Sequence, residues 1–204
     1  MGESAEKTII TYDDHANINK MGTFRTYTVK VEGSDITFKD LTIENNAAPL
    51  GQAVALHTEG DRLMFVGCRF LGNQDTIYTG SEGSRLLFTN CYIEGTTDFI
   101  FGPSTALFEY CELHSKRDSY ITAASTPQNE EFGYVFKNCK LTAAPGVKKV
   151  YLGRPWRPYA ATAFINCEFG GHIRPEGWHN WKNPENERTA RYAEFGNTGD
   201  GADT

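Results

Sequence analysis

The chain has 204 residues, of which 39% are hydrophobic and 13% aromatic, which suits one domain with a buried core. Its 20 basic and 26 acidic residues give a formal net charge of −6 at pH 7. No positive excess is available for a phosphate backbone, so we expect no nucleic-acid partner. No apolar run approaches the ~20 residues of a spanning helix, so we expect no membrane insertion.

One short pattern recurs six times: a Phe, a small apolar residue three positions later and a large apolar residue two positions after that. The copies begin at Phe38, Phe65, Phe88, Phe108, Phe136 and Phe164. Regular intervals of this kind, without helical periodicity, are typical of a solenoid in which each coil stacks on the one before. The pattern therefore predicts an all-β, right-handed parallel β-helix.

The small residue of the pattern is Leu41 in the first copy and a cysteine in the other five, which accounts for every cysteine of the chain. A column of stacked cysteines is most simply a set of small buried apolar side chains. Neighbouring coils would also permit a disulfide. Neither the cysteines nor the five histidines show the spacing of metal ligands, so we expect no metal site.

Runs rich in β-forming residues recur between the copies and predict a further set of strands. In chain order these strands are 27–31, 53–56, 76–78, 99–101, 120–122 and 150–152. The Phe and the small residue of each copy are three apart, so the chain must bend between them for both to face inward. Asn90, Asn138 and Asn166 occupy this bend, and Asn tolerates the left-handed conformation. Residues 176–188 are predicted as an external loop, with a returning strand near 191–195.

The stacking of coils brings two aspartates together. Each lies seven residues after the cysteine of its copy, Asp75 in one coil and Asp98 in the next. We therefore expect them one above the other, about 4.8 Å apart along the stack. Two such carboxyls cannot both ionise at low cost, so the pKa of one rises while the other stays ionised if a cation pairs with it. Arg154, in the segment Leu-Gly-Arg-Pro-Trp, is the candidate cation.

Two glutamines accompany the aspartates. Gln74 precedes Asp75, and Gln52 opens the predicted strand of the preceding coil. Paired amide donors favour an oxyanion and hence an acyl centre. A third aspartate, Asp118, has the same offset within its coil, but it lies in a charged turn without a neighbouring Gln or aromatic strand. We expect no catalytic role for Asp118.

At these residues the sequence resembles the pectin methylesterase (pectinesterase) family. Four motifs stand in the family's order: Gln52–Leu56, Gln74–Tyr78, Asp98–Gly102 and Leu152–Trp156. The segment Gly177–Trp181 also resembles the family's late tryptophan segment. The resemblance implies a parallel β-helix that hydrolyses the methyl esters of polygalacturonate and needs neither metal nor cofactor.

The resemblance also implies the roles of individual residues. Asp98 would be the nucleophile, and Arg154 would hold it ionised. Gln52 and Gln74 would donate hydrogen bonds to the oxyanion. Asp75 would protonate the departing methanol and then activate water.

Three aromatic residues, Trp156, Tyr78 and Phe101, would line a groove for the polysaccharide substrate, methyl-esterified homogalacturonan. The resemblance implies a secreted or periplasmic protein, although residues 1–7 lack the apolar core of a signal peptide. The sequence does not predict the oligomeric state.

The sequence departs from the family at two points. Residues 1–204 are expected to form a single β-helix catalytic domain that lacks coils of the family at both ends. Residues 122–126 read Thr-Ala-Ala-Ser-Thr where the family often has Thr-Ala-Gln-Gly-Arg. Two alternative hypotheses therefore stay open: a glycosidase or lyase on the same β-helix, and a fragment that binds polysaccharide without catalysis.

Overall fold

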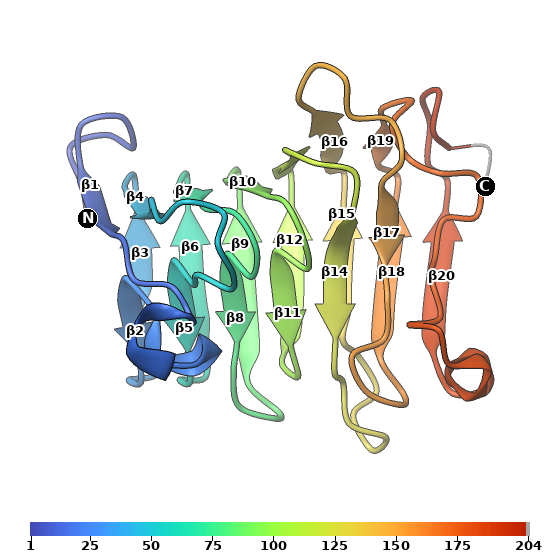
Figure 1. The fold of residues 1–204 in the computed structure, drawn as a ribbon, viewed down its shortest axis with the longest axis horizontal. Helices are drawn as coiled ribbons and strands as arrows, with labels where there is room; N and C mark the ends of the chain where they lie inside the picture. The colour runs from blue at the N-terminus through green and yellow to red at the C-terminus, as the bar shows by residue number, and fades with distance from the viewer. Residues whose placement is uncertain (203–204) are drawn as a thin grey trace.

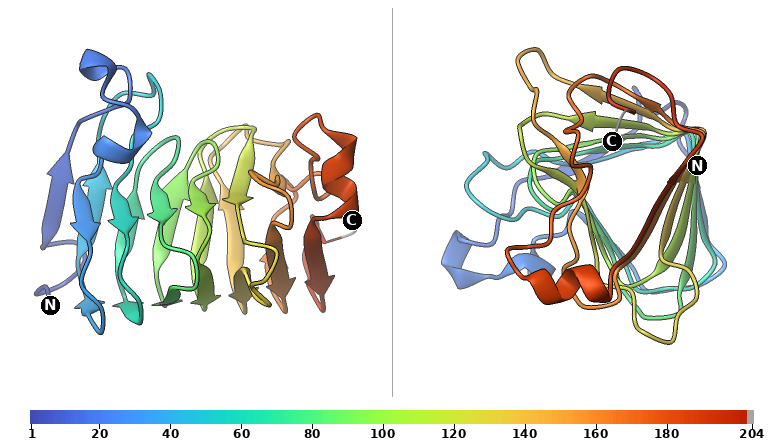
Figure 2. Two further views of the ribbon diagram at one scale, coloured as in Figure 1. Left: turned by 90° about the horizontal axis from the view of Figure 1, so that it is seen from below. Right: turned by 90° about the vertical axis from the view of Figure 1, so that its right-hand side faces the viewer.

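The computed structural model describes residues 1–202 as a stack of parallel β coils (Figure 1). Its strands form three parallel sheets, of seven, six and seven strands, named sheets A, B and C. Seen along the stack, the sheets enclose a triangular interior (Figure 2, right). Each strand pairs with the equivalent strand of the next coil. The parallel β-helix predicted from the sequence is confirmed.

Sheet A contains β1 (Ile9–Tyr12), β4 (Thr42–Asn45), β7 (Arg69–Leu71), β10 (Tyr92–Gly95), β13 (Glu112–Ser115), β16 (Lys140–Ala143) and β19 (Glu168–Phe169). Sheet B contains β2 (Val29–Val31), β5 (Leu56–Thr58), β8 (Ile77–Thr79), β11 (Ile100–Gly102), β14 (Tyr120–Ala124) and β17 (Tyr151–Gly153). Sheet C contains β3 (Thr37–Lys39), β6 (Leu63–Val66), β9 (Arg85–Thr89), β12 (Thr105–Glu109), β15 (Tyr134–Lys137), β18 (Ala161–Ile165) and β20 (Arg191–Phe195). Short 3-10 helices occur at η1 (Ile18–Lys20), η2 (Thr23–Arg25) and η3 (Pro184–Arg188).

The six Phe residues of the repeat stack in register along sheet C. Phe108, for example, pairs with Phe88 on one side and Phe136 on the other. Ring centroids of neighbours in the column are 4.5 to 5.2 Å apart and nearly parallel. Such pairs contribute about 0.5–1.5 kcal/mol each beyond their buried area. The Phe column therefore fixes the register of the coils from inside.

The five cysteines form a second internal column beside the Phe residues. All five are free and buried, and their thiols point to backbone carbonyls, as in the 3.3 Å contact from Cys139 Sγ to the Phe108 oxygen. The interpretation of the cysteines as small buried apolar side chains is confirmed.

The residue at the bend between Phe and Cys adopts the left-handed backbone conformation, as predicted. Asn90, Asn138 and Asn166 have φ angles of 52°, 55° and 53°. The equivalent positions Asp40, Gly67 and Tyr110 also have positive φ. The bend is therefore set by the fold, and Asn is one of several residues that adopt it.

Five of the six strands of sheet B begin one to three residues later than the sequence predicted, whereas β14 begins at the predicted residue, Tyr120. The largest shift is at β5, which covers Leu56–Thr58 instead of 53–56. The reason is a local bulge: the N–H groups of Ala55 and Leu56 both donate to the Thr76 carbonyl, which interrupts regular pairing before Leu56. The predicted returning strand is present as β20, and the predicted external loop at 176–188 ends in the short helix η3.

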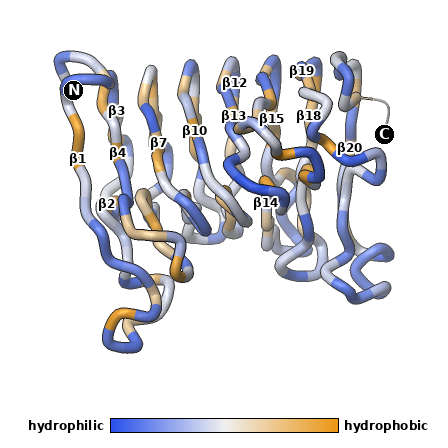
Figure 3. Tube along the Cα trace, turned by 45° about the horizontal axis from the view of Figure 1, so that its top comes forward, coloured by the Kyte–Doolittle hydropathy of each residue, from blue (hydrophilic) through white to orange (hydrophobic). Residues whose placement is uncertain are grey.

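Apolar and hydrophilic segments alternate around the coils (Figure 3). The terminal strand β1 exposes apolar residues to solvent, since Ile9 and Ile10 are 53% and 41% exposed. None of the helices formed by residues 1–202 is long and apolar enough to cross a membrane.

The Phe column yields a stability prediction. Phe108→Ala removes a fully buried ring from the middle of the column and should lower the free energy of unfolding by about 3–5 kcal/mol. Leu107→Ala, at the adjacent half-buried position, should cost clearly less. Urea unfolding of both variants and the parent chain measures this difference. Equal losses at the two positions would mean that the Phe column does not dominate packing.

Candidate active site

The residues predicted to be catalytic gather in one cavity on the outer side of sheet B. The cavity has a volume of about 350 Å³. It is lined by Thr23, Phe24, Gln52, Gln74, Asp75, Asp98, Phe101, Ala123, Arg154, Trp156 and Trp181. These residues come from seven segments of the chain, and the stacking of coils brings them together.

Asp75 and Asp98 lie at equivalent positions of consecutive coils. Ile77 pairs with Ile100, which places the residues two positions earlier one above the other. Both aspartates have positive φ, 66° for Asp75 and 49° for Asp98. This conformation is uncommon for residues other than Gly, although Asp tolerates it better than most. It turns both carboxyls out of the regular alternation of the strands just before β8 and β11 begin.

Arg154 binds Asp98 with both edges of its guanidinium fork. Its Nε donates to Oδ1 at 2.9 Å and its Nη2 to Oδ2 at 2.6 Å. The side chains of Arg154 and Asp98 are only 17% and 8% exposed. Such bidentate, charge-assisted pairs are among the stronger hydrogen bonds in proteins and fix geometry as well as charge.

Arg154 reaches Asp98 across an intervening coil. In sheet B, Phe101 pairs with Ala123. Thr122 pairs with Gly153, so Arg154 follows in the same column as Ala123. Ala123 lines the same cavity and presents only a methyl group in the column of Arg154.

The two carboxyls differ in their electrostatic surroundings. Burial raises the pKa of Asp75 well above its ordinary value, and the nearby Asp98 raises it further, against a smaller opposing effect of Arg154. Burial also raises the pKa of Asp98, but the hydrogen bonds and charge of Arg154 oppose that rise. Both pKa values are raised, and because Arg154 opposes the rise more strongly at Asp98, protonation of the pair begins at Asp75.

Gln52 and Gln74 lie next to this pair. They form an isolated parallel bridge between their coils, and both are half-buried in the cavity wall. The amide of each carries two N–H donors. The cavity thus combines two carboxyl groups in different electrostatic surroundings with amide donors.

Two of the three predicted aromatic residues line the cavity. Trp156 and Phe101 form part of its wall, with ring centroids 5.7 Å apart. Tyr78 is not among the lining residues. Its ring packs 4.9 Å from Phe101 and 4.9 Å from Phe24, so Phe24 covers it from the solvent side. Tyr78 therefore supports the wall from behind.

Phe24 and Trp181 line the cavity but were not assigned to it from the sequence. Phe24 lies on η2 and is 45% exposed, and its segment carries no motif or repeat that would mark it. Trp181 belongs to the tryptophan segment noted above, which resembles the family's late tryptophan segment. Trp178, the other tryptophan of this segment, is likewise half-buried and stacks on Tyr192, with ring centroids 4.1 Å apart.

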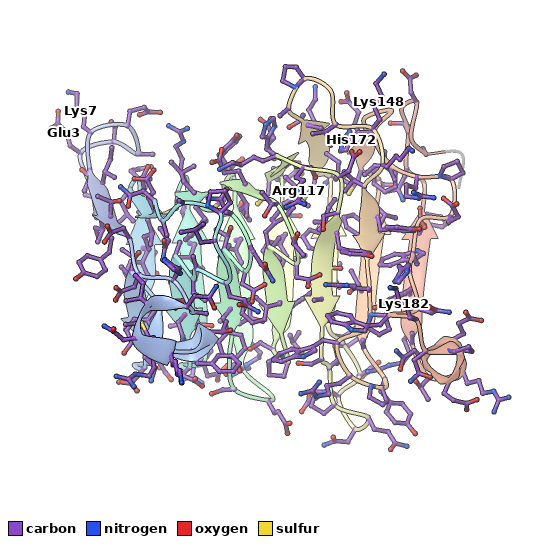
Figure 4. The ribbon with its side chains drawn as sticks, viewed as in Figure 1. Glu3, Lys7, Arg117, Lys148, His172 and Lys182 are labelled. Atoms are coloured by element: carbon purple, nitrogen blue, oxygen red, sulfur yellow. The ribbon has the colours of Figure 1, made fainter. Side chains whose placement is uncertain are left out.

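Asp118 lies outside the cavity. Its Oδ1 accepts hydrogen bonds from the backbone N–H groups of Lys148 and Lys149 at 2.7 and 2.9 Å, which lower its pKa. Arg117, which precedes Asp118, and Lys148 are labelled in Figure 4. Asp118 thus joins two turns. Within residues 1–202, no group of three His, Cys, Asp or Glu side chains is arranged to hold a metal ion.

Comparison with known proteins agrees with this geometry. The family model described as "Pectinesterase" matches residues 1–204. The chain belongs to the pectinesterase family. Pectinesterase 31 of Arabidopsis thaliana is 42% identical over 205 residues, which cover 95% of this chain and 64% of that protein.

Solved pectinesterase structures share the fold. The pectin methylesterase from carrot superposes with a TM-score of 0.93 at 32% identity, covering 99% of this chain and 66% of that one. A pectin methylesterase solved in complex with a hexasaccharide gives a TM-score of 0.87 at 30% identity, covering 98% of this chain and 74% of that one. The chain thus spans just under two thirds of the length of the Arabidopsis and carrot relatives.

The burial of Asp75 has a consequence for stability. An acid whose pKa is raised in the folded state stabilises the fold below its unfolded pKa, 3.8 for Asp75, and this stability is lost as the pH rises through the folded value. Asp75→Asn, which cannot ionise, should therefore be more stable than the parent chain at pH 7, and the gain should shrink near pH 4. Urea unfolding at the two pH values tests this expectation.

Asp118→Asn is the matched control, and its expected change in stability at neutral pH has the opposite sign. The pKa of Asp118 is lowered, so its ionised form stabilises the fold at neutral pH and its replacement should be mildly destabilising there. If Asp75→Asn instead lost stability at pH 7, the ionised form of Asp75 would be the one that the fold favours.

Proposed function

We propose that this chain hydrolyses the methyl esters of polygalacturonate and releases methanol while leaving the sugar chain intact. The observation that carries the proposal is the bidentate contact of Arg154 with Asp98 in the same cavity as Asp75. An ionised carboxylate beside a neutral one is what nucleophilic attack followed by proton transfer requires. Membership in the pectinesterase family supports the choice of ester.

In the first half of the proposed reaction, a carboxylate oxygen of Asp98 attacks the ester carbonyl carbon. The carbonyl oxygen becomes an oxyanion, which Gln52 and Gln74 stabilise through their amide N–H groups. One such donor typically contributes about 3 kcal/mol to the transition state. As the tetrahedral intermediate collapses, the proton of Asp75 passes to the methoxy oxygen, methanol leaves, and Asp98 is left acylated.

In the second half, Asp75 is a carboxylate and acts as a base. It removes a proton from water, and the resulting hydroxide attacks the acyl carbon attached to Asp98. The bond to Asp98 breaks, Asp75 keeps the proton taken from water, and the product leaves as a galacturonic acid group that loses its own proton to the solvent. Arg154 remains paired with Asp98 when its negative charge returns.

The proposed substrate is a methyl-esterified polysaccharide. Trp156, Phe101, Phe24 and Trp181 give the cavity an aromatic wall of the kind that stacks on sugar rings. The pectin methylesterase solved with a hexasaccharide supports this ligand class. We further propose that the stacked coils act as one catalytic β-helix domain, since all of these residues lie on it.

The direct test is an assay of the purified chain on methylated pectin. We expect methanol without new reducing ends. New reducing ends would indicate a glycosidase, unsaturated products a lyase, and binding without turnover a polysaccharide-binding fragment. Each of these three results would contradict the proposed esterase activity.

The role of Asp98 predicts a nearly complete loss of activity on substitution. Asp98→Asn keeps the size of the side chain but removes the nucleophile, so methanol release should fall to background. Asp118→Asn is the control and should retain activity, because Asp118 lies outside the cavity. Thermal unfolding of both variants checks that they fold. A folded Asp98→Asn with parental activity would refute the assignment of the nucleophile.

A further inference from the structure

The guanidinium group of Arg154 lies between two aromatic rings. Its Cζ is 3.9 Å from the centroid of Tyr120 and 3.6 Å from that of Trp181. The two rings thus hold the guanidinium by its π-faces, while its edge carries the two hydrogen bonds to Asp98. Such cation–π contacts are stronger when the cation is shielded from water, and the Arg154 side chain is only 17% exposed.

Tyr120 is placed to hold both members of the ion pair. It lies one coil beyond Asp98, and its carbonyl accepts a hydrogen bond from the Asp98 N–H at 2.8 Å. Its ring stacks on Tyr151 of the following coil, with centroids 5.3 Å apart and planes only 13° from parallel. Tyr120 does not line the cavity, so its ring has no evident contact with substrate.

Trp181 reaches the other face of Arg154 at the cost of an unfavourable backbone. It has a φ of 59°, and Lys182, labelled in Figure 4, has 57°. Bulky residues rarely adopt this conformation, and the surrounding structure must hold them in it. The Trp181 N–H donates to Nδ1 of His179 at 3.0 Å, and the His179 ring packs on Tyr120 at 5.3 Å. The loop is therefore braced against the same tyrosine that supports Arg154.

We propose that Tyr120 and Trp181 are positioning residues that clamp the Arg154 guanidinium, so that both of its hydrogen bonds stay on Asp98 through the reaction. The expected effect of this clamp on the reaction rate rests on the proposed function. The expected effect of the clamp on the pKa of Asp98 does not, because the Asp98 carboxyl can be titrated without turnover.

The clamp affects the pKa of Asp98, which burial raises and the charge of Arg154 lowers. Among the described residues, Asp75, Arg154 and Tyr192 are the titratable groups whose interaction with Asp98 is resolved. Arg154 is the cation of this set, and its contact opposes the rise in the Asp98 pKa that burial causes. If one ring is removed, the guanidinium can rotate away from Asp98, and burial then favours the protonated carboxyl.

Three variants test the clamp. Tyr120→Leu removes the supporting ring, whereas Tyr120→Phe keeps it. Tyr92→Leu is a matched control, because Tyr92 makes a similar contact with Arg69, 5.3 Å from Cζ to centroid, outside the cavity. The side-chain carboxyl ¹³C signal of Asp98, assigned by its loss in Asp98→Asn, is titrated in each variant. We expect its midpoint to rise in Tyr120→Leu only.

Kinetics supply a second readout. With methylated pectin, Tyr120→Leu should lower kcat about tenfold at neutral pH with little change in KM. The acid limb of its pH–rate profile should move to higher pH. The double variant Arg154→Ala with Tyr120→Leu should be no slower than Arg154→Ala alone, since the ring acts through Arg154.

The outcomes separate the two proposals. An unchanged Asp98 titration in a folded Tyr120→Leu overturns the clamp, as does an additive loss in the double variant. If Tyr120→Leu does not fold, Trp181→Leu on the loop side is titrated in its place, with the same expected rise. If the parent chain releases no methanol, the esterase proposal fails, and the titration still decides the clamp.

Discussion

Each coil of this protein must lie on its neighbour in one register, because the Phe column and the cysteine column fill the interior only when equivalent residues coincide. The Phe rings stack at 4.5 to 5.2 Å, and a slip of one residue would turn every inward side chain outward. This internal stacking also determines the outer surface. Asp75 and Asp98 lie together because the apolar residues beneath them do.

The site contains several energetically unfavourable features, which the stability of the rest of the fold must offset. Two carboxyls are largely buried, and each lies on backbone with positive φ. Burying charge is costly unless it is paired. Arg154 pairs with Asp98, whereas burial and the nearby Asp98 raise the pKa of Asp75 well above its ordinary value. The asymmetry of the two carboxyls thus follows from one guanidinium.

The geometry also bears on which chemistry the site can perform. A pair of carboxyls on a β-helix would suit a glycosidase as well as an esterase, so the carboxyls alone do not choose. The bidentate hold on Asp98 and the adjacent Gln52 and Gln74 favour a fixed nucleophile facing an oxyanion. All of these residues lie between positions 52 and 154, within the part of the chain that its longer pectinesterase relatives share.

The sequence by itself determined the periodic features: the β-helix, the left-handed bends at Asn90 and its equivalents, and the pairing of Asp75 with Asp98. These follow from residue offsets, which stacked coils convert directly into distances. Only the tertiary structure decided the positions of Phe24 and Trp181, the covering of Tyr78, and the rings on either side of Arg154. Those contacts come from non-periodic loops, where side-chain direction depends on how distant segments pack and no spacing in the sequence records it.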